Sequence, residues 1–332
     1  MNNSKIKLIA SYFPEGVLTN EMISKEFPAW NPVKIEEKIG VVQRHVVSEN
    51  ETSLDLAYNA ASKILEKYDK NKIGFVILCT QSPEYLLPTT ACILQSKLGL
   101  GKNVGAFDFN LGCSGYIYGL AFSKSLIMAN MTKSVLLVMS ETYTKYINDL
   151  DFANRSIFGD AATATIIEYD EKEYIHEFVF GTDGEGASNL IIPNGGARNK
   201  YNKDSILEEV NGNKRTDNDL FMNGPEIFNF TIATIPKLVN DVLEKNNLEV
   251  SDVDYFIFHQ ANKFMLDYLR KKLKVPTEKF YNNIMNTGNT VSSTIPIALK
   301  DCLENDVIKP GDKVLLCGFG VGYSWGATVI TI

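Results

Sequence analysis

The sequence is poor in several features that would assign it to a functional class. Its 332 residues include only three histidines and five cysteines, with no Cys-x-x-Cys pair. No histidine stands at metal-ligand spacing from a cysteine, which argues against a zinc site, and the odd number of cysteines argues against a disulfide framework. The net charge is −7 and no block of five or six like charges occurs. Nucleic acid and anionic membrane surfaces are therefore not expected as main partners.

Long apolar runs are missing as well. No run approaches the roughly 18 residues of a membrane-spanning helix, and residues 1–7 lack the apolar core of a signal peptide. We therefore expect a soluble, cytoplasmic protein. Hydrophobic residues make up 45% of the chain, enough for one large core or for two cores of ordinary domain size.

Strand and helix patterns alternate along the first half of the chain. The short apolar run 73–80 is typical of a strand buried on both faces of a parallel sheet. Segments 134–141 and 158–167 predict further strands. Apolar residues at helical spacing over 53–65 predict an amphipathic helix, and Pro88 near the start of segment 88–98 favours another.

The second half repeats this order of patterns. Four segments of the second half match four segments of the first half in the same order. The matched pairs are 254–266 with 73–98, 280–299 with 107–120, 311–320 with 134–139, and 326–332 with 162–167. Such a repeat predicts an internal duplication into two α/β halves, residues 1–170 and 171–332, packed about a pseudo-twofold axis. Functional groups are then expected at strand ends that face a shared cleft. The polar segment 183–218 predicts surface loops and turns.

The candidate nucleophile is Cys113. A strand pattern breaks at Gly112-Cys113 and resumes as a helix pattern, with small residues on both sides that permit a sharp turn. The free amides and positive dipole end of a helix N-terminus favour the thiolate, which is the reactive form of cysteine. Because free cysteine is also among the most buried residue types, Cys113 alone does not distinguish a nucleophile from a core residue.

The duplication supplies partners for this cysteine. It aligns Cys113 with Asn289, each at a turn between a strand and a helix, and it places His259 at the end of a neighbouring strand. The other two histidines, His45 and His176, fall inside short strand-like runs, which indicates structural roles.

Four motifs together resemble a known family. The Cys113 segment, His259-Gln-Ala-Asn262, Gly288-Asn-Thr-Val-Ser-Ser-Thr-Ile-Pro296 and Gly318-Phe-Gly-Val-Gly-Tyr-Ser-Trp-Gly326 resemble beta-ketoacyl-acyl carrier protein synthase III, of the thiolase-like superfamily. The resemblance covers nearly the whole chain. It implies an α/β protein with the duplicated thiolase-like αβαβα fold of five layers, assembled as a homodimer.

The resemblance also implies a reaction. Cys113 would take an acyl group from acyl-CoA or an acyl carrier protein as a thioester, splitting one difficult transfer into two easier steps. His259 and Asn289 would bind the enolate oxygen that forms as a malonyl thioester loses carbon dioxide, and the backbone amides of Cys113 and Val321 would bind the acyl carbonyl oxygen. This chemistry of fatty acid biosynthesis requires neither a metal nor an organic cofactor.

Some positions depart from the family pattern. Leu87 replaces a phenylalanine that reaches into the acyl pocket of the partner subunit, and Phe319 is expected to line the same pocket. Val321 stands where a third glycine is common. Lys34 and Lys38 replace the tryptophan and arginine that hold the CoA adenine, which leaves both CoA and a carrier protein open as the bearer of the donor.

A basic run follows His259 on an expected helix. The run comprises Lys263, Arg270, Lys271, Lys272 and Lys274. Of these, Lys263, Arg270 and Lys271, with the preceding Asn262, are the candidate binding residues. A charge run is commonly a solvated face, but in an acidic protein it would also dock CoA or an acidic carrier protein.

Three functions therefore stay open. The first is decarboxylative condensation to a 3-oxoacyl thioester. The second is acyl transfer from Cys113 to a hydroxyl or amine acceptor, such as a sugar, without decarboxylation. The third is a catalytically silent module that binds a carrier protein, and the presence of Cys113, His259 and Asn289 argues against it.

Overall fold

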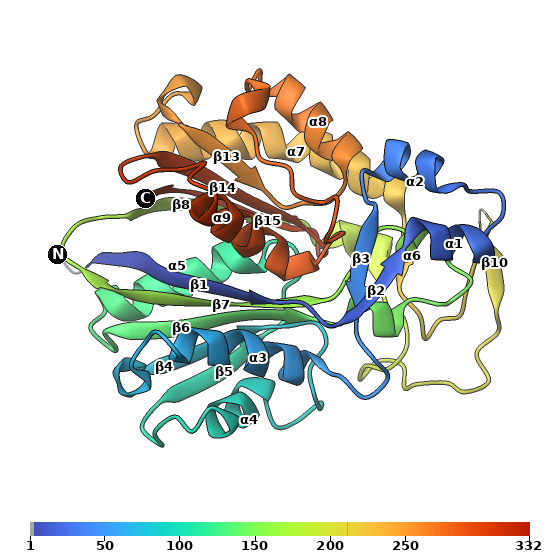
Figure 1. Ribbon diagram of the computed structural model, residues 1–332, viewed down its shortest axis with the longest axis horizontal. Helices are drawn as coiled ribbons and strands as arrows, with labels where there is room; N and C mark the ends of the chain where they lie inside the picture. The colour runs from blue at the N-terminus through green and yellow to red at the C-terminus, as the bar shows by residue number, and fades with distance from the viewer. Residues whose placement is uncertain (1–2, 211) are drawn as a thin grey trace.

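Two mixed β-sheets form the frame of the protein (Figure 1). The computed structural model describes residues 3–210 and 212–332. The first sheet has the strand order β1 (Asn3–Tyr12), β7 (Ala161–Asp170), β6 (Ser134–Glu141), β4 (Phe75–Cys79) and β5 (Gly105–Phe109). The second has the order β13 (Tyr255–Phe258), β14 (Lys313–Gly320), β15 (Ser324–Thr331) and β8 (Ile175–Thr182). The strands predicted at 73–80, 134–141 and 158–167 are confirmed.

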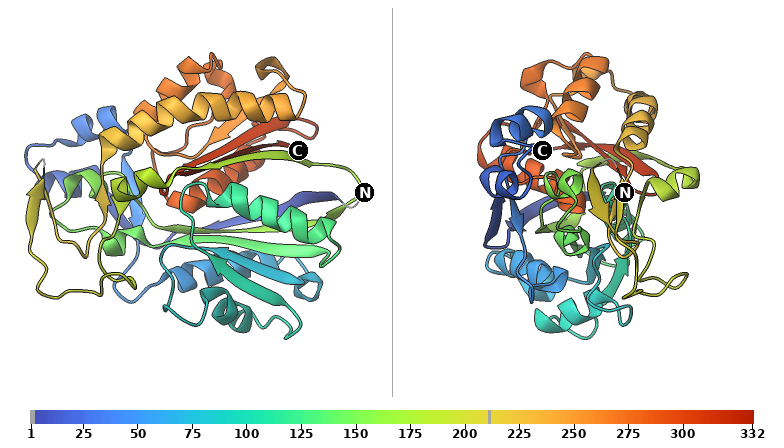
Figure 2. Two further views of the ribbon diagram at one scale, coloured as in Figure 1. Left: turned by 180° about the vertical axis from the view of Figure 1, so that it is seen from behind. Right: turned by 90° about the vertical axis from the view of Figure 1, so that its right-hand side faces the viewer.

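Helices cover both outer faces of the sheets and fill the space between them (Figures 1 and 2). The central layer holds α5 (Gly115–Met128) and α9 (Thr294–Glu304), and the outer layers hold α3 (Ser53–Leu65) with α4 (Thr90–Lys97) and α7 (Gly224–Lys245) with α8 (Lys263–Lys272). The predicted αβαβα order of five layers is therefore present.

Strand β4 has an unbroken apolar sequence because both of its faces are buried. Its successive side chains point to opposite faces, so that Ile77 and Cys79 join the core of the central layer while Val76 and Leu78 join the core beneath α3 and α4. Both faces of the strand are covered, as the sequence pattern indicated.

The duplication is visible in the sheets, with one gap. The order β1-β7-β6-β4 corresponds to β8-β15-β14-β13, and α5 corresponds to α9. At the place equivalent to β5, however, the second half has a single parallel bridge between Phe256 and Phe280. The strand predicted at the start of segment 280–299 is therefore wrong beyond that one pair.

A smaller group of elements covers one end of the two sheets (Figure 2). It contains β2 (Gly16–Thr19), α1 (Asn20–Glu26), α2 (Pro32–Ile39), β3 (Gln43–Val46) and α6 (Phe152–Arg155). Segment 183–218, predicted as loops and turns, also contains short strands β9 (Leu190–Ile191), β10 (Glu208–Val210) and β11 (Asn213–Arg215), and β9 pairs with β12 (Phe221–Met222). Position 211 of this segment lies outside the described residues.

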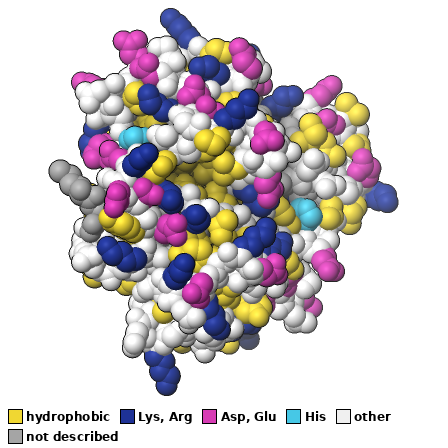
Figure 3. Space-filling view, turned by 60° about the vertical axis from the view of Figure 1, so that its left-hand side comes forward, with side chains coloured by type: hydrophobic (Ala, Val, Ile, Leu, Met, Phe, Trp, Pro, Cys, Tyr) yellow, Lys and Arg dark blue, Asp and Glu magenta, His cyan; other side chains and the backbone are white. Residues whose placement is uncertain are grey.

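The surface seen in Figure 3 carries charges of both signs, scattered over the face, and hydrophobic side chains gather near its middle. Within the described part of the chain, no helix is long and apolar enough to cross a membrane.

Candidate active site

Cys113 lies in the short turn between β5 and α5. Its side chain is 6% exposed, and it packs against strand β14 of the other sheet. A Cβ atom at Gly320 would lie 2.9 Å from Cys113 Sγ, and one at Gly318 would lie 2.9 Å from Cys113 O. Only glycine permits so close an approach at these positions. The turn that carries Cys113 is thus in direct contact with β14 of the other sheet.

The thiol of Cys113 is less acidic than its position before a helix suggested. Burial raises its pKa to about 12, and the nearby carboxyl of Glu141 adds to the increase. Backbone N–H groups of Cys113 and Val321 act in the opposite direction. Desolvation outweighs the helix terminus, so the expectation of a thiolate in the unliganded protomer is wrong.

The two backbone N–H groups that lie against the sulfur are those named for the acyl oxyanion. The loop that carries Val321 is held by side chains, because Ser324 Oγ donates to Val321 O at 2.9 Å and pairs with Ser114 Oγ at 2.6 Å. A hydrogen-bonded link therefore joins the start of α5 to the Val321 loop.

His259 follows β13 and is almost fully buried. Its backbone N–H donates to Cys317 O at 2.8 Å, and its ring Nδ1 lies 2.7 Å from Thr294 Oγ1. Burial lowers the pKa of the ring to about 3. The imidazole is consequently neutral at any working pH, with one ring nitrogen protonated.

Asn289 is placed by its backbone and oriented by its side chain. Its N–H donates to Ile157 O at 2.9 Å and its carbonyl accepts from Gly159 N at 3.1 Å. Its side-chain Oδ1 accepts from Val291 N at 2.9 Å, which turns Nδ2 toward His259 Nε2 at 3.4 Å. The amide donor and the ring therefore point at the same region.

The same region includes Cys113. The side chain of Val291, two residues after Asn289, lies beside Gly112 together with that of Val321. A cluster of apolar side chains around the cysteine contains Tyr143, Phe158, Leu190, Leu220 and Val291. The sequence reasoning missed these residues, since Leu190 and Leu220 stand in or next to a segment without periodicity.

Neither of the two residues expected in an acyl pocket belongs to the apolar cluster around Cys113 of the same protomer. Phe319 belongs to the core beneath α7 and α8, and its ring meets the ring of His259 edge-on at 5.7 Å. Leu87 is 82% exposed and outside the cluster around Cys113.

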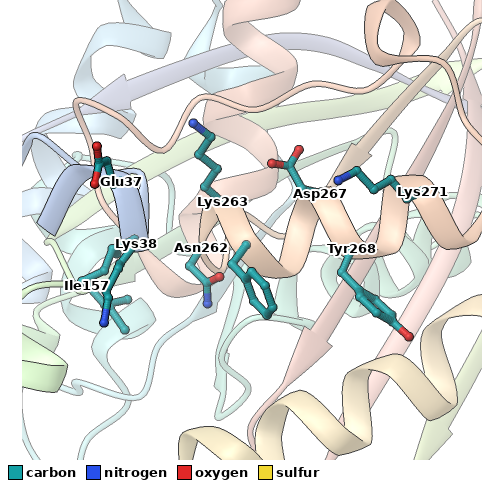
Figure 4. A pocket seen from close by; sticks show the side chains of 10 residues that line it. Glu37, Lys38, Ile157, Asn262, Lys263, Asp267, Tyr268 and Lys271 are labelled. Carbon is teal, nitrogen blue, oxygen red and sulfur yellow. The ribbon is translucent and has the colours of Figure 1, made fainter. Parts of the chain in front are cut away.

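A cleft of about 670 Å³ opens between α2 and α8. It is lined by Lys38, Asn262, Lys263 and Lys271, and also by the acidic Glu37 and Asp267. In Figure 4, Asn262 and Tyr268 project to one side of α8 and Lys263 and Lys271 to the other. The two helices meet at Gly40, which ends α2 with a φ of 83° and packs against the side chain of Lys263.

Two of the predicted basic residues do not line this cleft. Lys34 lies over the ring of Trp30, 4.5 Å from its centroid, and Trp30 stacks on Phe152 at 4.3 Å. Arg270 donates to Val275 O at 3.1 Å, at the end of its own helix. Residues 3–210 and 212–332 contain no group of three or more His, Cys, Asp or Glu side chains able to hold a metal ion.

Comparison with known proteins assigns this arrangement to a family. Residues 107–184 match the family model of 3-oxoacyl-[acyl-carrier-protein] synthase III, and residues 243–332 match the model of its C-terminal part. Beta-ketoacyl-[acyl-carrier-protein] synthase III of Fusobacterium nucleatum is 36% identical, and the match covers 99% of both chains. The chain belongs to the beta-ketoacyl-acyl carrier protein synthase III family.

Solved structures support the same assignment. The crystal structure of a 3-oxoacyl-(acyl-carrier-protein) synthase III is 44% identical with a TM-score of 0.97, and covers 99% of this chain and 100% of that one. A 3-oxoacyl-(acyl-carrier-protein) synthase from Burkholderia xenovorans is 35% identical with a TM-score of 0.92, over 100% and 95% of the two chains. The resemblance and the thiolase-like fold are confirmed, and the protein is an enzyme of the acyltransferase type.

Proposed function

We propose that the protein transfers an acyl group to Cys113 and condenses it with a malonyl thioester, releasing carbon dioxide and a 3-oxoacyl thioester. The observation that carries this proposal is the meeting of the Asn289 amide and the His259 ring beside Cys113. Simple acyl transfer needs a nucleophile, a base and an oxyanion site. A second pair of donors is needed only when an enolate forms.

In the first half-reaction, Cys113 Sγ attacks the thioester carbonyl of the donor. The bond from that carbonyl to the donor sulfur breaks, and the thiol proton passes to the departing thiolate. The carbonyl oxygen becomes negative as the new C–S bond forms. The backbone N–H groups of Cys113 and Val321 lie against the sulfur. They would donate hydrogen bonds to this negative oxygen and stabilise it.

In the second half-reaction, the C–C bond to the malonyl carboxylate breaks and carbon dioxide leaves. The electron pair of that bond forms an enolate. The enolate oxygen accepts from Asn289 Nδ2 and from His259 Nε2, in the tautomer that carries the ring proton on Nε2. The enolate carbon then attacks the acyl thioester on Cys113. A C–C bond forms, the C–S bond breaks, and the departing thiolate takes up a proton from solvent, which regenerates the cysteine thiol.

We further propose a homodimer that completes the acyl pocket with Leu87 of the partner subunit. Supporting this, β5 is an edge strand, and the loop after β4 exposes large apolar side chains, with Tyr85 60%, Leu86 86% and Leu87 82% exposed. Unpaired strand edges and exposed apolar patches are typical of interaction sites.

We propose that the donor and the malonyl group arrive on acyl carrier protein through the cleft of Lys38, Asn262, Lys263 and Lys271. Charge complementarity between these lysines and an acidic carrier would speed association. Trp30 already stacks on Phe152, and Lys34 lies over the ring of Trp30. These contacts disfavour insertion of a CoA adenine beside Trp30.

We also propose the division into halves 1–170, with the nucleophile, and 171–332, with His259 and Asn289. The end of β7 at Asp170 and the start of β8 at Ile175 support it.

The test combines intact-protein mass with carbon dioxide release. The wild-type enzyme should gain one acyl mass from an acyl donor and then release carbon dioxide from malonyl-carrier protein. Cys113→Ser should lose the adduct, whereas Cys92→Ser, at an exposed free cysteine, should keep it. If the acylated enzyme releases no carbon dioxide but passes its acyl group to a sugar or an amine, acyl transfer replaces condensation.

A further inference from the structure

A carboxyl group is buried between the two halves of the site and has no role in the steps above. Glu141 ends β6 and is 0% exposed. Its Oε2 accepts from Gln81 N at 3.0 Å and from Ser82 Oγ at 3.4 Å, and its Oε1 accepts from Ser292 Oγ at 3.0 Å. Within the described residues no lysine, arginine or histidine forms an ion pair with it. Burying such a group without a counter-ion is unfavourable, so its retention needs an explanation.

The turn that Glu141 reaches is strained. Val291 has a φ of 55°, a left-handed conformation that is a genuine outlier for a β-branched residue and persists only where neighbouring contacts hold it. This conformation directs Val291 N–H to Asn289 Oδ1 at 2.9 Å. Its carbonyl accepts from Thr294 Oγ1 at 3.0 Å, the hydroxyl that also contacts His259 Nδ1. One strained residue thus sets both proposed enolate donors.

We propose that Glu141 is a positioning residue that holds the Val291 turn through Ser292 and so orients Asn289 and His259 for decarboxylation. The inference rests on the proposed function. Glu141, Gln81 and Ser82 belong to the half that carries Cys113, whereas Ser292 belongs to the half that carries the enolate donors. The Glu141–Ser292 hydrogen bond therefore links the nucleophile side of the site to the decarboxylation side.

Among residues 3–210 and 212–332, the titratable groups around Glu141 are acidic or neutral. The titratable side chains whose charge interacts with it are Asp160, Cys79, Cys113, Tyr143 and Tyr146. Burial raises the pKa of Glu141 to about 8, so the protonated form is present at neutral pH. Glutamine, which has the same shape, one carbonyl acceptor and an uncharged NH2 group in place of the O–H, is accordingly the conservative replacement.

The test separates the two half-reactions. In Glu141→Ala, acylation of Cys113 should stay within about threefold of wild type, while carbon dioxide release from malonyl-carrier protein falls at least about tenfold, because misplaced groups lose catalytic effect steeply. Glu141→Gln should recover most of that loss. A merely structural role would lower both half-reactions together or only the melting temperature.

A double-mutant cycle identifies the link. Ser292→Ala should show the same selective loss, and Glu141→Ala/Ser292→Ala should be no worse than the more damaged single variant. The matched control is Ser293→Ala, whose hydroxyl donates to Met139 O instead and whose effect should add to that of Glu141→Ala. Additive effects of Glu141 and Ser292, or unchanged decarboxylation in folded Ser292→Ala, would overturn the inference. If wild-type enzyme fails to decarboxylate malonyl-carrier protein, the proposed function itself falls and this inference with it.

Discussion

The turn at Cys113 and the turn at Asn289 occupy equivalent places in the duplicated fold, but they are built differently. The first follows a full strand, β5, which pairs with β4 over five residues, and reaches α5 through Gly112 and Gly115. The second follows a single bridge at Phe280 and reaches α9 through Val291 in a left-handed conformation. Pairing with a full strand precedes the nucleophile, whereas the enolate donors are oriented by side-chain hydrogen bonds and by the left-handed Val291.

This difference separates two kinds of sensitivity. Changes around Cys113 should act by steric contact on acyl loading, because its neighbours are glycines of β14 that leave no free space. Changes around Asn289 should act on the orientation of donors and therefore on decarboxylation. If the two turns act independently, a substitution at one turn should slow one half-reaction and leave the rate of the other near wild type.

The largest expected effect comes from Asn289→Ala. Loss of one preorganised donor should lower carbon dioxide release from malonyl-carrier protein by about 10² to 10³. Acylation of Cys113, followed by intact-protein mass, should remain near wild type. Asn305→Ala, at the exposed end of α9, should leave both rates unchanged. An equal loss in the two half-reactions would show that the turns are not independent.

The reverse pattern is expected from Gly320→Ala. The new Cβ would lie 2.8 Å from Cys113 Cβ and 2.9 Å from Sγ, so the sulfur must move. A displacement of this size should lower the rate of acyl loading on the order of a hundredfold. Intact-protein mass spectrometry of samples quenched at successive times measures this rate. Gly101→Ala, where no atom lies within 4 Å of the added Cβ, serves as the control. Normal loading in folded Gly320→Ala would contradict the contact.

A smaller effect should appear in stability as pH changes from 6.5 to 8. Glu141 has a pKa of about 8 when folded against an ordinary value of 4.5, so the folded state binds the extra proton and its free energy of unfolding falls as pH rises. The decrease is on the order of 1 to 2 kcal/mol over this window. His259, with a pKa lowered to about 3, acts only below its ordinary 6.5 and with the opposite sign.

Denaturant unfolding at several pH values measures this slope, and Glu141→Gln should reduce it between pH 6.5 and 8. The same slope in wild type and variant would mean that Glu141 does not keep its proton in the folded protein.

The smallest effect concerns the cleft. Lys263→Ala or Lys271→Ala should raise the KM for acyl-carrier protein by a few-fold at low salt and by less at high salt, because exposed charges are screened. Lys237→Ala, on an exposed part of α7, is the matched control. A salt-independent change, or an equal change for Lys237, would contradict docking at this surface.

Much of the scaffold was predictable because its signals are local. The unbroken apolar run before residue 80 was correctly assigned to a strand covered on both sides, and the internal repeat predicted the paired sheets. The strand expected near Phe280 does not form, because this segment pairs with β13 at one position only, between Phe280 and Phe256. Its sequence resembles a strand, but pairing depends on a partner distant in sequence.

For the active site, the residue types were predictable and their chemical state was not. Cys113, His259 and Asn289 stand out by position and by motif. The helix start suggested an acidic thiol, yet burial raises the Cys113 pKa, because desolvation depends on everything that packs around the sulfur. Leu87 similarly illustrates a residue whose surroundings in one protomer are solvent.

The sequence by itself determined the order of strands and helices, the duplication and the identity of the proposed nucleophile and donors, since periodicity, turn residues and motif spacing are properties of neighbouring positions. Only the tertiary structure decided which groups meet. The contact of Gly320 with Cys113 and the Glu141–Ser292 hydrogen bond join residues from different halves of the chain, and the left-handed Val291 packs beside Gly112 of the other half. Their geometry follows from how two sheets and a central helical layer pack, which no local pattern encodes.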